Sequence, residues 1–419
     1  MNAKEIISKL TLEEKASRCS GADFWNIEGL ERFGIKPAMV TDGPHGLRKQ
    51  AGETDHLGIN NSVPATCFPT ACTTACSFDR GLMQKMGNAL GEECLQENVA
   101  VLLGPGANLK RSPLCGRNFE YISEDPYVTG EIAAALIGGI QEKGVGTSMK
   151  HFAANNQEKM RLTSNSIIDE RTLRELYLAG FETAVKKVQP WTLMCSYNKI
   201  NGVYSCENLK LLTEILRDEW GFKGLVMTDW GAINERVNGV VAGLDLEMPG
   251  SEGVNDAKIV KAVQDGTLPE KAVDICALRV VELLLKAEEN RKTGYKYDVE
   301  EHHQLAKTVA AQSAVLLKND ENILPISPTQ NILVIGEFAK TPRYQGAGSS
   351  KINPLKIDTA LNSMRVTSNS IMYADGYSLQ NNANDKILRE QACTTAKDKD
   401  VVVIFAGLPD AAESEGFDR

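Results

Sequence analysis

The sequence has little histidine, no excess of positive charge and no long apolar run. Only five of its 419 residues are histidine, and none forms an HExxH pattern or a cluster with cysteine. We therefore expect no metal and no other cofactor. The 46 lysine and arginine residues are outnumbered by 55 aspartate and glutamate residues, and the net charge of −9 argues against a nucleic-acid partner. Because no stretch of about 18 apolar residues occurs, the sequence predicts no membrane span and no membrane partner.

The ten cysteines include no CxxC pair, and several lie inside apolar runs. This distribution predicts reduced, buried thiols rather than a disulfide framework. The first 16 residues, MNAKEIISKLTLEEKA, are charged and amphipathic, without the apolar segment or small-residue cleavage site of a signal peptide. We expect a cytoplasmic protein, and the sequence is compatible with a homo-oligomer.

Short apolar runs alternate with long amphipathic stretches up to about residue 288. The runs cover residues 37–40, 99–103, 145–149, 192–196, 225–227 and 243–246. Helical patterns lie between and after them, at 79–98, 130–144, 170–188, 208–221 and 269–290. Sustained strand–helix alternation predicts a parallel sheet, and its length favours a TIM-barrel-like (β/α)8 domain over a doubly wound sheet.

A polar connector at 289–303 precedes a second α/β pattern. We therefore predict a barrel domain at 1–288, a linker at 289–303 and the first part of another α/β domain at 304–419. Two strands are expected there, at 331–336 and 401–407, which are too few to bury both faces of a sheet. The sequence therefore predicts a piece of a longer protein, whose remaining C-terminal segment is a partner, in the same chain or a second one.

Each apolar run of the first unit stops at polar residues. These residues are Asp42 and Arg48; Asn108, Arg111 and Arg117; Lys150 and His151; Tyr197 and Asn198; Asp229; and Glu247. In a barrel the carboxyl ends of all strands meet on one face, which holds the active site. We therefore expect one pocket, although its members are spread over 200 residues.

The segment Val-Met-Thr-Asp-Trp-Gly-Ala at 226–232 is the most informative of these ends. Asp229 follows a predicted buried strand and is followed by Trp230. A carboxylate at a strand end can bond the anomeric carbon of a sugar, and a flat ring beside it can contact a sugar face. Alone, such an aspartate is more often a turn former or a helix cap.

Other interpretations exist for each remaining residue. Asp42 fits a turn, His151 a buried core histidine, and Tyr197 core packing with a bonded hydroxyl. Arg117 has two glutamates, at 120 and 124, within its own loop. Jointly these interpretations leave unexplained why every strand ends in a group that can bind hydroxyls.

Two further segments are ambiguous. Glu124 and Asp125 precede a helical pattern and are predicted to cap it. The Gly-rich segment QGAGSS at 345–350 lacks the strand and helix of a phosphate-binding fingerprint, so a ligand-facing loop at the domain interface is expected.

Six motifs occur in the order known from one family. They are DGPHGLR, GRNFEYISEDPYVTG, KHFAANNQE, SYNKING, MTDWGA and ESEGFDR. Together they closely resemble glycoside hydrolase family 3, in the clade of bacterial and fungal β-glucosidases. The resemblance implies a barrel-like first domain with Asp229 as nucleophile and an α/β-sandwich domain whose loop carries an acid/base glutamate. Glu415 fits that position best, and Glu413 is the alternative.

The resemblance also implies a sugar-binding set. Asp42, with Arg48 after it, binds outer hydroxyls; Arg117, Lys150 and His151 hold others; Arg161 and Tyr197 flank the nucleophile; Trp230 forms a wall; and Ser349 closes over the sugar from the second domain.

The expected activity is that of a retaining exo-acting β-glycosidase that removes terminal non-reducing β-D-glucosyl residues from oligosaccharides or glucosides. A β-xylosidase or α-arabinofuranosidase, a metal-dependent barrel lyase or isomerase, and an inactive sugar-binding fragment are the alternatives. Because the chain has KHFAANNQE where an N-acetylhexosaminidase is expected to carry KHFPGHG, the hexosaminidase interpretation is weak.

The mechanism requires two carboxylates in opposite protonation states. We expect Lys150, His151 and Arg161 to lower the pKa of Asp229, and burial beside another carboxylate to raise the pKa of Glu415. Since the sequence stops four residues after Glu415, the loop is also expected to lack a second attachment.

Overall fold

The computed structural model describes residues 1–50, 52, 54, 60–368, 370–380 and 384–419. Its first domain is built on a parallel sheet in which each strand pairs with the next along the chain. The strands are β2 (Ala38–Asp42), β4 (Val101–Leu103), β5 (Gly146–Phe152), β7 (Thr192–Cys195) and β10 (Leu225–Met227). A short strand, β1 (Asn26–Ile27), pairs antiparallel with β2.

Two single bridges connect the far edge of this sheet back towards β1. Met227 bridges Leu246 in parallel, and Glu247 bridges Ser20. The expected strand at 243–246 is reduced to such bridges, since the Val226 N–H donates to Asp245 Oδ2 at 2.8 Å rather than to a backbone carbonyl. The domain is therefore barrel-like, as predicted, but its named strands include an antiparallel one and do not form eight equal repeats.

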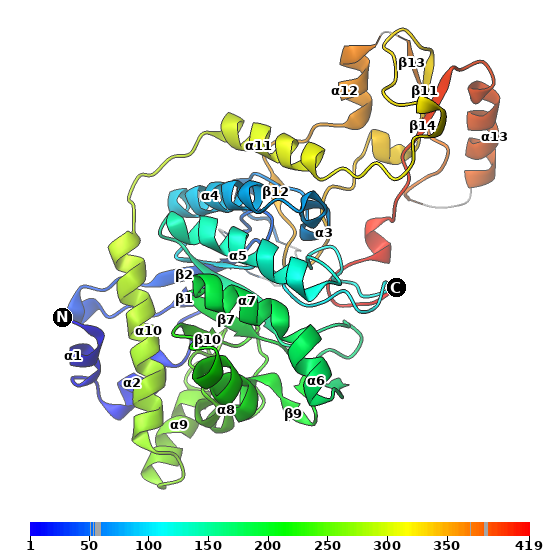
Figure 1. Cartoon of the computed structure of the whole chain (residues 1–419). Coiled ribbons are helices and arrows are strands. Elements are labelled where there is room, and N and C mark those ends of the chain that lie inside the picture. The colour runs from blue at the N-terminus through cyan, green and yellow to red at the C-terminus, as the bar shows by residue number, and fades with distance from the viewer. Residues whose placement is uncertain (51, 53, 55–59, 369, 381–383) are drawn as a thin grey trace.

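Helices cover the outside of the sheet, and Figure 1 shows three of them side by side: α4 (Arg80–Gln96), α5 (Pro126–Glu142) and α7 (Ala179–Val188). As predicted, Asp125 caps α5, because its carboxylate accepts hydrogen bonds from the N–H groups of residues 127 and 128. The close approach of α4 and α5 requires glycine. A Cβ on Gly139 would lie 2.2 Å from the Gln84 carbonyl oxygen.

The other elements of this domain range from two-residue strands to a 21-residue helix. They are α1 (Ala3–Ile7), α2 (Leu12–Arg18), β3 (Pro64–Ala65), α3 (Ala71–Thr74), β6 (Asn165–Ser166), α6 (Glu170–Thr172), β8 (Lys199–Ile200), β9 (Val203–Tyr204), the π-helix Lys210–Glu219, α8 (Arg236–Ala242), α9 (Val254–Gln264) and α10 (Glu270–Asn290). Within the described ranges, no helix is long and apolar enough to span a lipid bilayer.

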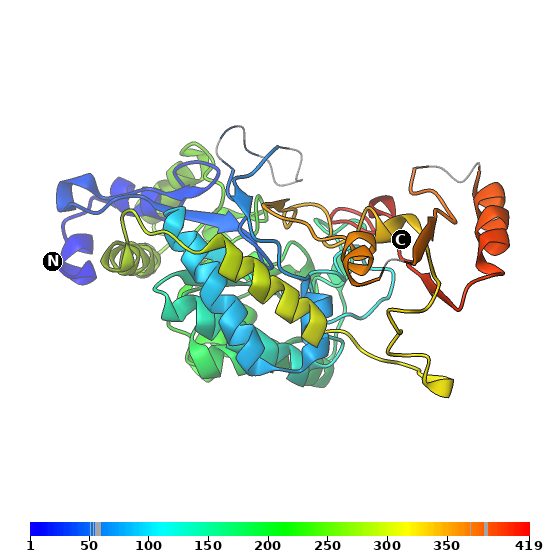
Figure 2. The same ribbon diagram turned by 90° about the horizontal axis from the view of Figure 1, so that it is seen from above.

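The second domain contains a three-stranded parallel sheet in the order β13, β11, β14. The sheet lies between two helices in Figures 1 and 2. Its elements are β11 (Ile332–Ile335), α12 (Ala360–Thr367), β13 (Ile371–Ala374), α13 (Asp385–Ala396) and β14 (Val401–Ile404). Two of these strands coincide with the runs expected from the sequence.

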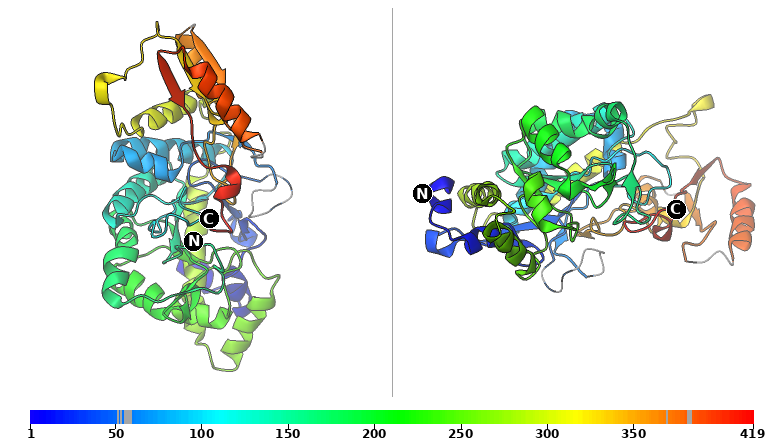
Figure 3. Two further views of the ribbon diagram at one scale, coloured as in Figure 1. Left: turned by 90° about the vertical axis from the view of Figure 1, so that its right-hand side faces the viewer. Right: turned by 90° about the horizontal axis from the view of Figure 1, so that it is seen from below.

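Several segments of the second half contact the barrel. Helix α11 (Val299–Gln312) packs on α4, where the two ring nitrogens of His302 lie 3.2 Å from Glu92 and 2.9 Å from Glu93. Strand β12 (Asn353–Pro354) pairs with β3. The C-terminal segment runs back to the first domain (Figure 3). The predicted boundaries at 288 and 304 stay predictions.

Candidate active site

Asp229 lies two residues beyond β10 and is 8% exposed. Its Oδ1 accepts a hydrogen bond from the Trp230 N–H at 2.8 Å. Its Oδ2 is buried, has no hydrogen-bond partner in the described part of the chain, and lies 3.5 Å from His151 Nε2. One oxygen of this carboxylate is thus committed to the backbone, and the other remains available to a ligand.

His151, on β5, is a neutral imidazole. Burial lowers its pKa well below the ordinary value, and the charges of Arg117, Lys150 and Arg161 lower it further. Its Nδ1 lies 3.2 Å from the Tyr121 hydroxyl. A neutral ring adds no positive charge next to the Asp229 carboxylate.

Asp42, at the end of β2, forms a buried charged cluster. Its Oδ2 lies 3.2 Å from Arg48 Nη1, and its Oδ1 lies 3.6 Å from Lys150 Nζ. Burial raises the pKa of Asp42 to about 6; the two cations oppose this rise, while the charges of Glu415 and Asp229 add to it. The three carboxylates therefore belong to one electrostatic environment, although they come from distant parts of the sequence.

Aromatic side chains adjoin the Asp229 strand end. Trp230 donates from Nε1 to the Phe24 carbonyl at 2.9 Å, and its ring centroid lies 5.2 Å from that of Trp25. The Tyr197 hydroxyl donates to the Trp230 carbonyl at 3.1 Å, and the Arg161 guanidinium lies 4.7 Å from the Tyr197 ring centroid. These contacts fix the ring next to Asp229 and bring Arg161 and Tyr197 together beside it.

Glu415 reaches this site from the second domain. Its Oε1 lies 2.8 Å from Arg161 Nη1 and 3.4 Å from Arg117 Nη1, and its Oε2 accepts from the Ser349 N–H at 2.7 Å. Gly348 has a φ of +94°, and a Cβ there would lie 2.5 Å from the Glu415 side chain. The Gly-rich loop therefore contacts the carboxylate directly, and Ser349 does so through its backbone.

The expected increase in the pKa of Glu415 is wrong. Burial raises the pKa of this carboxyl, but Arg117, Arg161 and the hydrogen bonds from Ser349 outweigh burial and hold the pKa well below its usual range. Glu415 is therefore ionised in this arrangement. Arg161 and Lys150, expected to act on Asp229, form their ion pairs with other carboxylates: Arg161 with Glu158 and Glu415, Lys150 with Asp42.

The expectation that the Glu415 loop lacks a second attachment is also wrong. The Asp418 carboxylate accepts from the N–H groups of Gly116 (3.0 Å), Glu158 (3.0 and 3.1 Å) and Lys159 (3.0 Å), all in the barrel domain. The Arg419 N–H donates to the Leu114 carbonyl at 2.9 Å. Local sequence patterns do not indicate these contacts, because they join segments more than 250 residues apart.

Two buried glutamates were not singled out as site residues. Glu120 pairs with Arg117 at 2.6 Å, which realises one of the local pairings considered above. Glu158 lies 2.8 Å from Arg161 and accepts from the Gly416 N–H at 2.9 Å; burial raises its pKa to about 7. Glu158 belongs to the KHFAANNQE motif, so the motif contained the signal.

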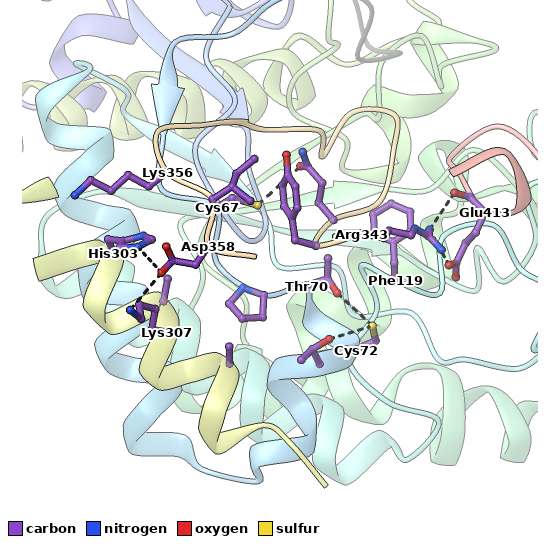
Figure 4. A pocket seen from close by; sticks show the side chains of 17 residues that line it. Cys67, Thr70, Cys72, Phe119, His303, Lys307, Arg343, Lys356, Asp358 and Glu413 are labelled. Atoms are coloured by element: carbon purple, nitrogen blue, oxygen red, sulfur yellow. Dashed lines mark hydrogen bonds and ion pairs between the residues drawn. The ribbon is translucent and has the colours of Figure 1, made fainter. Parts of the chain in front are cut away.

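The alternative donor, Glu413, lies elsewhere. Its Oε2 lies 3.0 Å from Arg343 Nη2, and it lines a cavity of about 490 Å³ between α11, α3 and the second domain (Figure 4). Asp229, Asp42 and Lys150 are not among the residues that line this cavity. Geometry therefore favours Glu415 over Glu413 as the partner of Asp229.

Glu247, the last of the strand-end residues, is held by protein groups. Its Oε1 accepts from Asn255 at 2.7 Å, and its Oε2 lies 3.7 Å from Arg236. Over the ranges that the structure covers, no three histidine, cysteine, aspartate or glutamate side chains are grouped as metal ligands.

Comparison with known proteins supports one family. The model of the glycosyl hydrolase family 3 N-terminal domain matches residues 40–283, and that of the C-terminal domain matches residues 314–419. Thermostable β-glucosidase B of Acetivibrio thermocellus is 54% identical, over 100% of this chain and 56% of the relative. An exo-α-(1→6)-L-arabinopyranosidase of Bifidobacterium breve is 51% identical, over 99% of this chain and 56% of the relative.

Solved structures agree. The family 3 β-glucosidase of Bifidobacterium adolescentis superposes with a TM-score of 0.92 at 50% identity, covering 99% of this chain and 59% of that one. β-Glucosidase 3B of Thermotoga neapolitana, in complex with glucose, has a TM-score of 0.87 at 34% identity, covering 100% of this chain and 64% of that one. The chain spans 56% of the length of the curated relatives named above. By its sequence and its fold, this chain belongs to glycosyl hydrolase family 3.

Proposed function

We propose that the protein containing this chain is a β-glucosidase that removes terminal non-reducing β-D-glucosyl residues by double displacement. Asp229 is the nucleophile and Glu415 the acid/base residue. The observation that carries the proposal is the buried Oδ2 of Asp229 at a barrel strand end. It has no hydrogen-bond partner among the described residues, and it lies in one site with a carboxylate from the other domain. β-Glucosidases among the relatives support the choice of sugar, and β-xylosidase or α-arabinofuranosidase activity is not favoured.

In the first step, Asp229 Oδ2 attacks the anomeric carbon, the glycosidic C–O bond breaks, and Glu415 gives its proton to the leaving oxygen. In the second step, Glu415 takes a proton from the water that attacks the anomeric carbon, and the ester bond to Asp229 breaks and releases the sugar. The ion pairs of Glu415 with Arg161 and Arg117 match the second step, which needs an ionised base. The first step requires Glu415 to take up a proton, and a bound sugar that displaces Arg161 from it would favour that state.

The charged cluster supplies the sugar contacts. Asp42 and Lys150 can accept from and donate to neighbouring hydroxyls, and hydrogen bonds to ionised groups are stronger than neutral ones. Arg48 keeps the Asp42 carboxylate oriented. Trp230 provides an apolar surface beside Asp229 on which a sugar ring can pack.

The test is the stereochemistry of hydrolysis of p-nitrophenyl β-D-glucoside by the full-length protein. Proton NMR within the first turnovers is expected to show β-glucose before mutarotation. First-formed α-glucose would exclude double displacement. Absence of glucose release, with a native melting transition, would exclude the activity itself.

A second candidate is removal of terminal α-L-arabinopyranosyl residues, because a relative 51% identical to this chain is named for that activity. The two sugars differ in the hydroxymethyl group, which an arabinopyranoside lacks. The ratio of kcat/KM for p-nitrophenyl β-D-glucoside to that for p-nitrophenyl α-L-arabinopyranoside decides between them: a ratio above one supports the first proposal, and a ratio below one the second.

Two expectations about the whole protein remain proposals. The greater length of the relatives supports a further segment adjoining the second domain. The ten free cysteines, six of them buried, support a reducing compartment such as the cytoplasm.

A further inference from the structure

Asp418 joins three loops that together surround Glu415. Its three donors lie on two barrel loops: Gly116 on one, and Glu158 and Lys159 on the other. The first loop carries Arg117 one residue further on, and the second carries Arg161 two residues after Lys159. The two arginines that bind Glu415 are therefore tied, through backbone groups beside them, to a side chain three residues after Glu415.

The segment that carries Glu415 is a tight turn. Ser414 and Phe417 form an antiparallel bridge, so Glu415 and Gly416 are the two residues at its tip. Gly416 has a φ of +98°, which favours glycine, and its N–H donates to Glu158 Oε2 at 2.9 Å. A turn this short transmits the position of its base to its tip, and Asp418, with the Arg419 N–H beside it, binds its base to the barrel.

The barrel surface is shaped for this turn. A Cβ on Gly116 would lie 1.8 Å from the Phe417 carbonyl oxygen and 2.2 Å from that of Ser414. No side chain fits at Gly116 while the turn is docked. The contact is thus a close backbone-to-backbone approach, fastened by an ionised carboxylate on three N–H groups, and hydrogen bonds of this kind are stronger than those between neutral groups.

We propose that Asp418 is a positioning residue for proton transfer: by docking the turn on the barrel, it sets the place of the Glu415 carboxylate relative to Asp229. It contacts backbone groups of the protein and does not belong to the sugar-binding set. This inference rests on the proposed function, in which Glu415 is the acid/base residue. A proton donor must lie within hydrogen-bond distance of the leaving oxygen, so a small displacement of the turn impairs protonation before it impairs binding.

The experiment uses Asp418→Asn in the full-length protein, with Asp410→Asn as the control. Asparagine keeps the size of the side chain but loses its charge and turns an NH2 group towards N–H donors. Asp410 lies on the same segment, its side chain is 81% exposed, and it lies 3.5 Å from Arg343. Each variant is assayed on p-nitrophenyl β-D-glucoside, whose leaving group needs little protonation, and on methyl β-D-glucoside, whose leaving group needs much.

We expect Asp418→Asn to lower kcat/KM on methyl β-D-glucoside, which reports the first step, by about ten- to a hundredfold, part of what general acid catalysis contributes. On the activated substrate we expect kcat/KM to fall by less than about threefold. Asp410→Asn should resemble the unchanged protein. Equal losses on both substrates, in proportion to the folded fraction, would show a merely structural role and overturn the inference.

Two further variants keep the outcomes distinct. Glu415→Ala must show the same pattern, a larger loss on the substrate with the poor leaving group than on the activated one. If it does not, the proposed function fails. If Glu415→Ala shows it and Asp418→Asn does not, only the inference fails. Should Asp418→Asn not fold, Gly116→Ala disturbs the same contact from the barrel side, and the same leaving-group selectivity is expected from it; its absence would overturn the inference.

Discussion

The two regions that meet at the site hold their carboxylates in different ways. Asp229 follows strand β10, whose Val226 and Met227 are fully buried in the barrel. The described core of the second domain is small: Ile332, Val334, Ala339 and Leu361. Apolar side chains remain exposed there, such as Leu317 at 92% and Ile404 at 66%.

The difference shows which contacts position the carboxylate that each half contributes to the site. The barrel positions Asp229 through a strand inside its own core. The second domain positions Glu415 mainly through contacts with the barrel, namely Arg161, Arg117 and the attachment of Asp418. Damage to the barrel side should therefore abolish chemistry outright, and damage to the second side should show selective losses.

The largest effect is expected from Asp229→Asn on the barrel side. An amide cannot form the glycosyl ester, so kcat on p-nitrophenyl β-D-glucoside should fall by about 10⁴ or more, as for other lost nucleophiles. The melting temperature should change by no more than about 2–4 °C, because the residue faces the site rather than the core. Appreciable residual turnover in a contaminant-free preparation would contradict the role given to Asp229.

Glu415→Ala tests the second side. Hydrolysis of cellobiose should fall by about 10²- to 10⁴-fold, the contribution of general acid catalysis, and activated glucosides should be less affected. Added azide should restore turnover of the activated glucosides, since it can replace water in the second step without a base. Glu413→Ala is the matched control, because Glu413 pairs with Arg343 outside the site. If Glu413→Ala gives the azide-rescued pattern instead, the donor is misassigned.

Paired leucine truncations compare the two cores. Leu361 is 4% exposed in the second domain, and Leu193 is fully buried in the barrel. Each change to alanine should cost about 2–5 kcal/mol of unfolding free energy. Leu361→Ala should cause local unfolding of the second domain. Amide hydrogen exchange should become faster in β11 and β14 and stay unchanged in the barrel. Uniform exchange throughout the Leu361→Ala chain would show that the two regions unfold as one.

The smallest expected effect is a pH dependence of stability that comes from Glu158, where the barrel contacts the second domain. Burial raises the pKa of Glu158 to about 7, from an ordinary value of 4.5, so the folded chain binds this proton more tightly than the unfolded chain. Its contribution to stability is therefore lost as pH rises from about 4.5 to 7, by at most about 3 kcal/mol. The melting temperature of Glu158→Gln, measured relative to that of the unchanged protein, should be higher at pH 8 than at pH 5. The exposed Glu124→Gln should show no such trend, and a trend of opposite sign for Glu158→Gln would contradict the assignment.

Sequence patterns predicted the parts of this molecule that local chemistry determines. Short apolar runs and turn residues located β2, β5 and β10. The convergence of barrel strand ends on one face predicted that Asp42, Lys150 and Asp229 lie in one site. The sequence did not show that Leu246 forms a single bridge instead of belonging to a strand. This outcome depends on the Asp245 side chain, which replaces a backbone carbonyl as hydrogen-bond acceptor.

The electrostatics of Glu415 were predicted wrongly for a similar reason. Burial alone would have raised its pKa, but the outcome depends on the tertiary positions of Arg117 and Arg161. The attachment of Asp418 was missed because an aspartate in a loop gives no sign of which distant N–H groups it meets. Local sequence thus identified the chemical groups, and long-range packing determined their charge states and supports.

Because α11 packs on α4, the two halves of the chain are held together by more than the peptide bonds that connect them. His302 lies between Glu92 and Glu93, and β12 pairs with β3, so the peptide segment at 291–298 is only one of several links between the halves. A protein cut within that segment is expected to remain assembled as two pieces. The two halves could then be produced separately and recombined, which would allow each to be labelled or exchanged on its own.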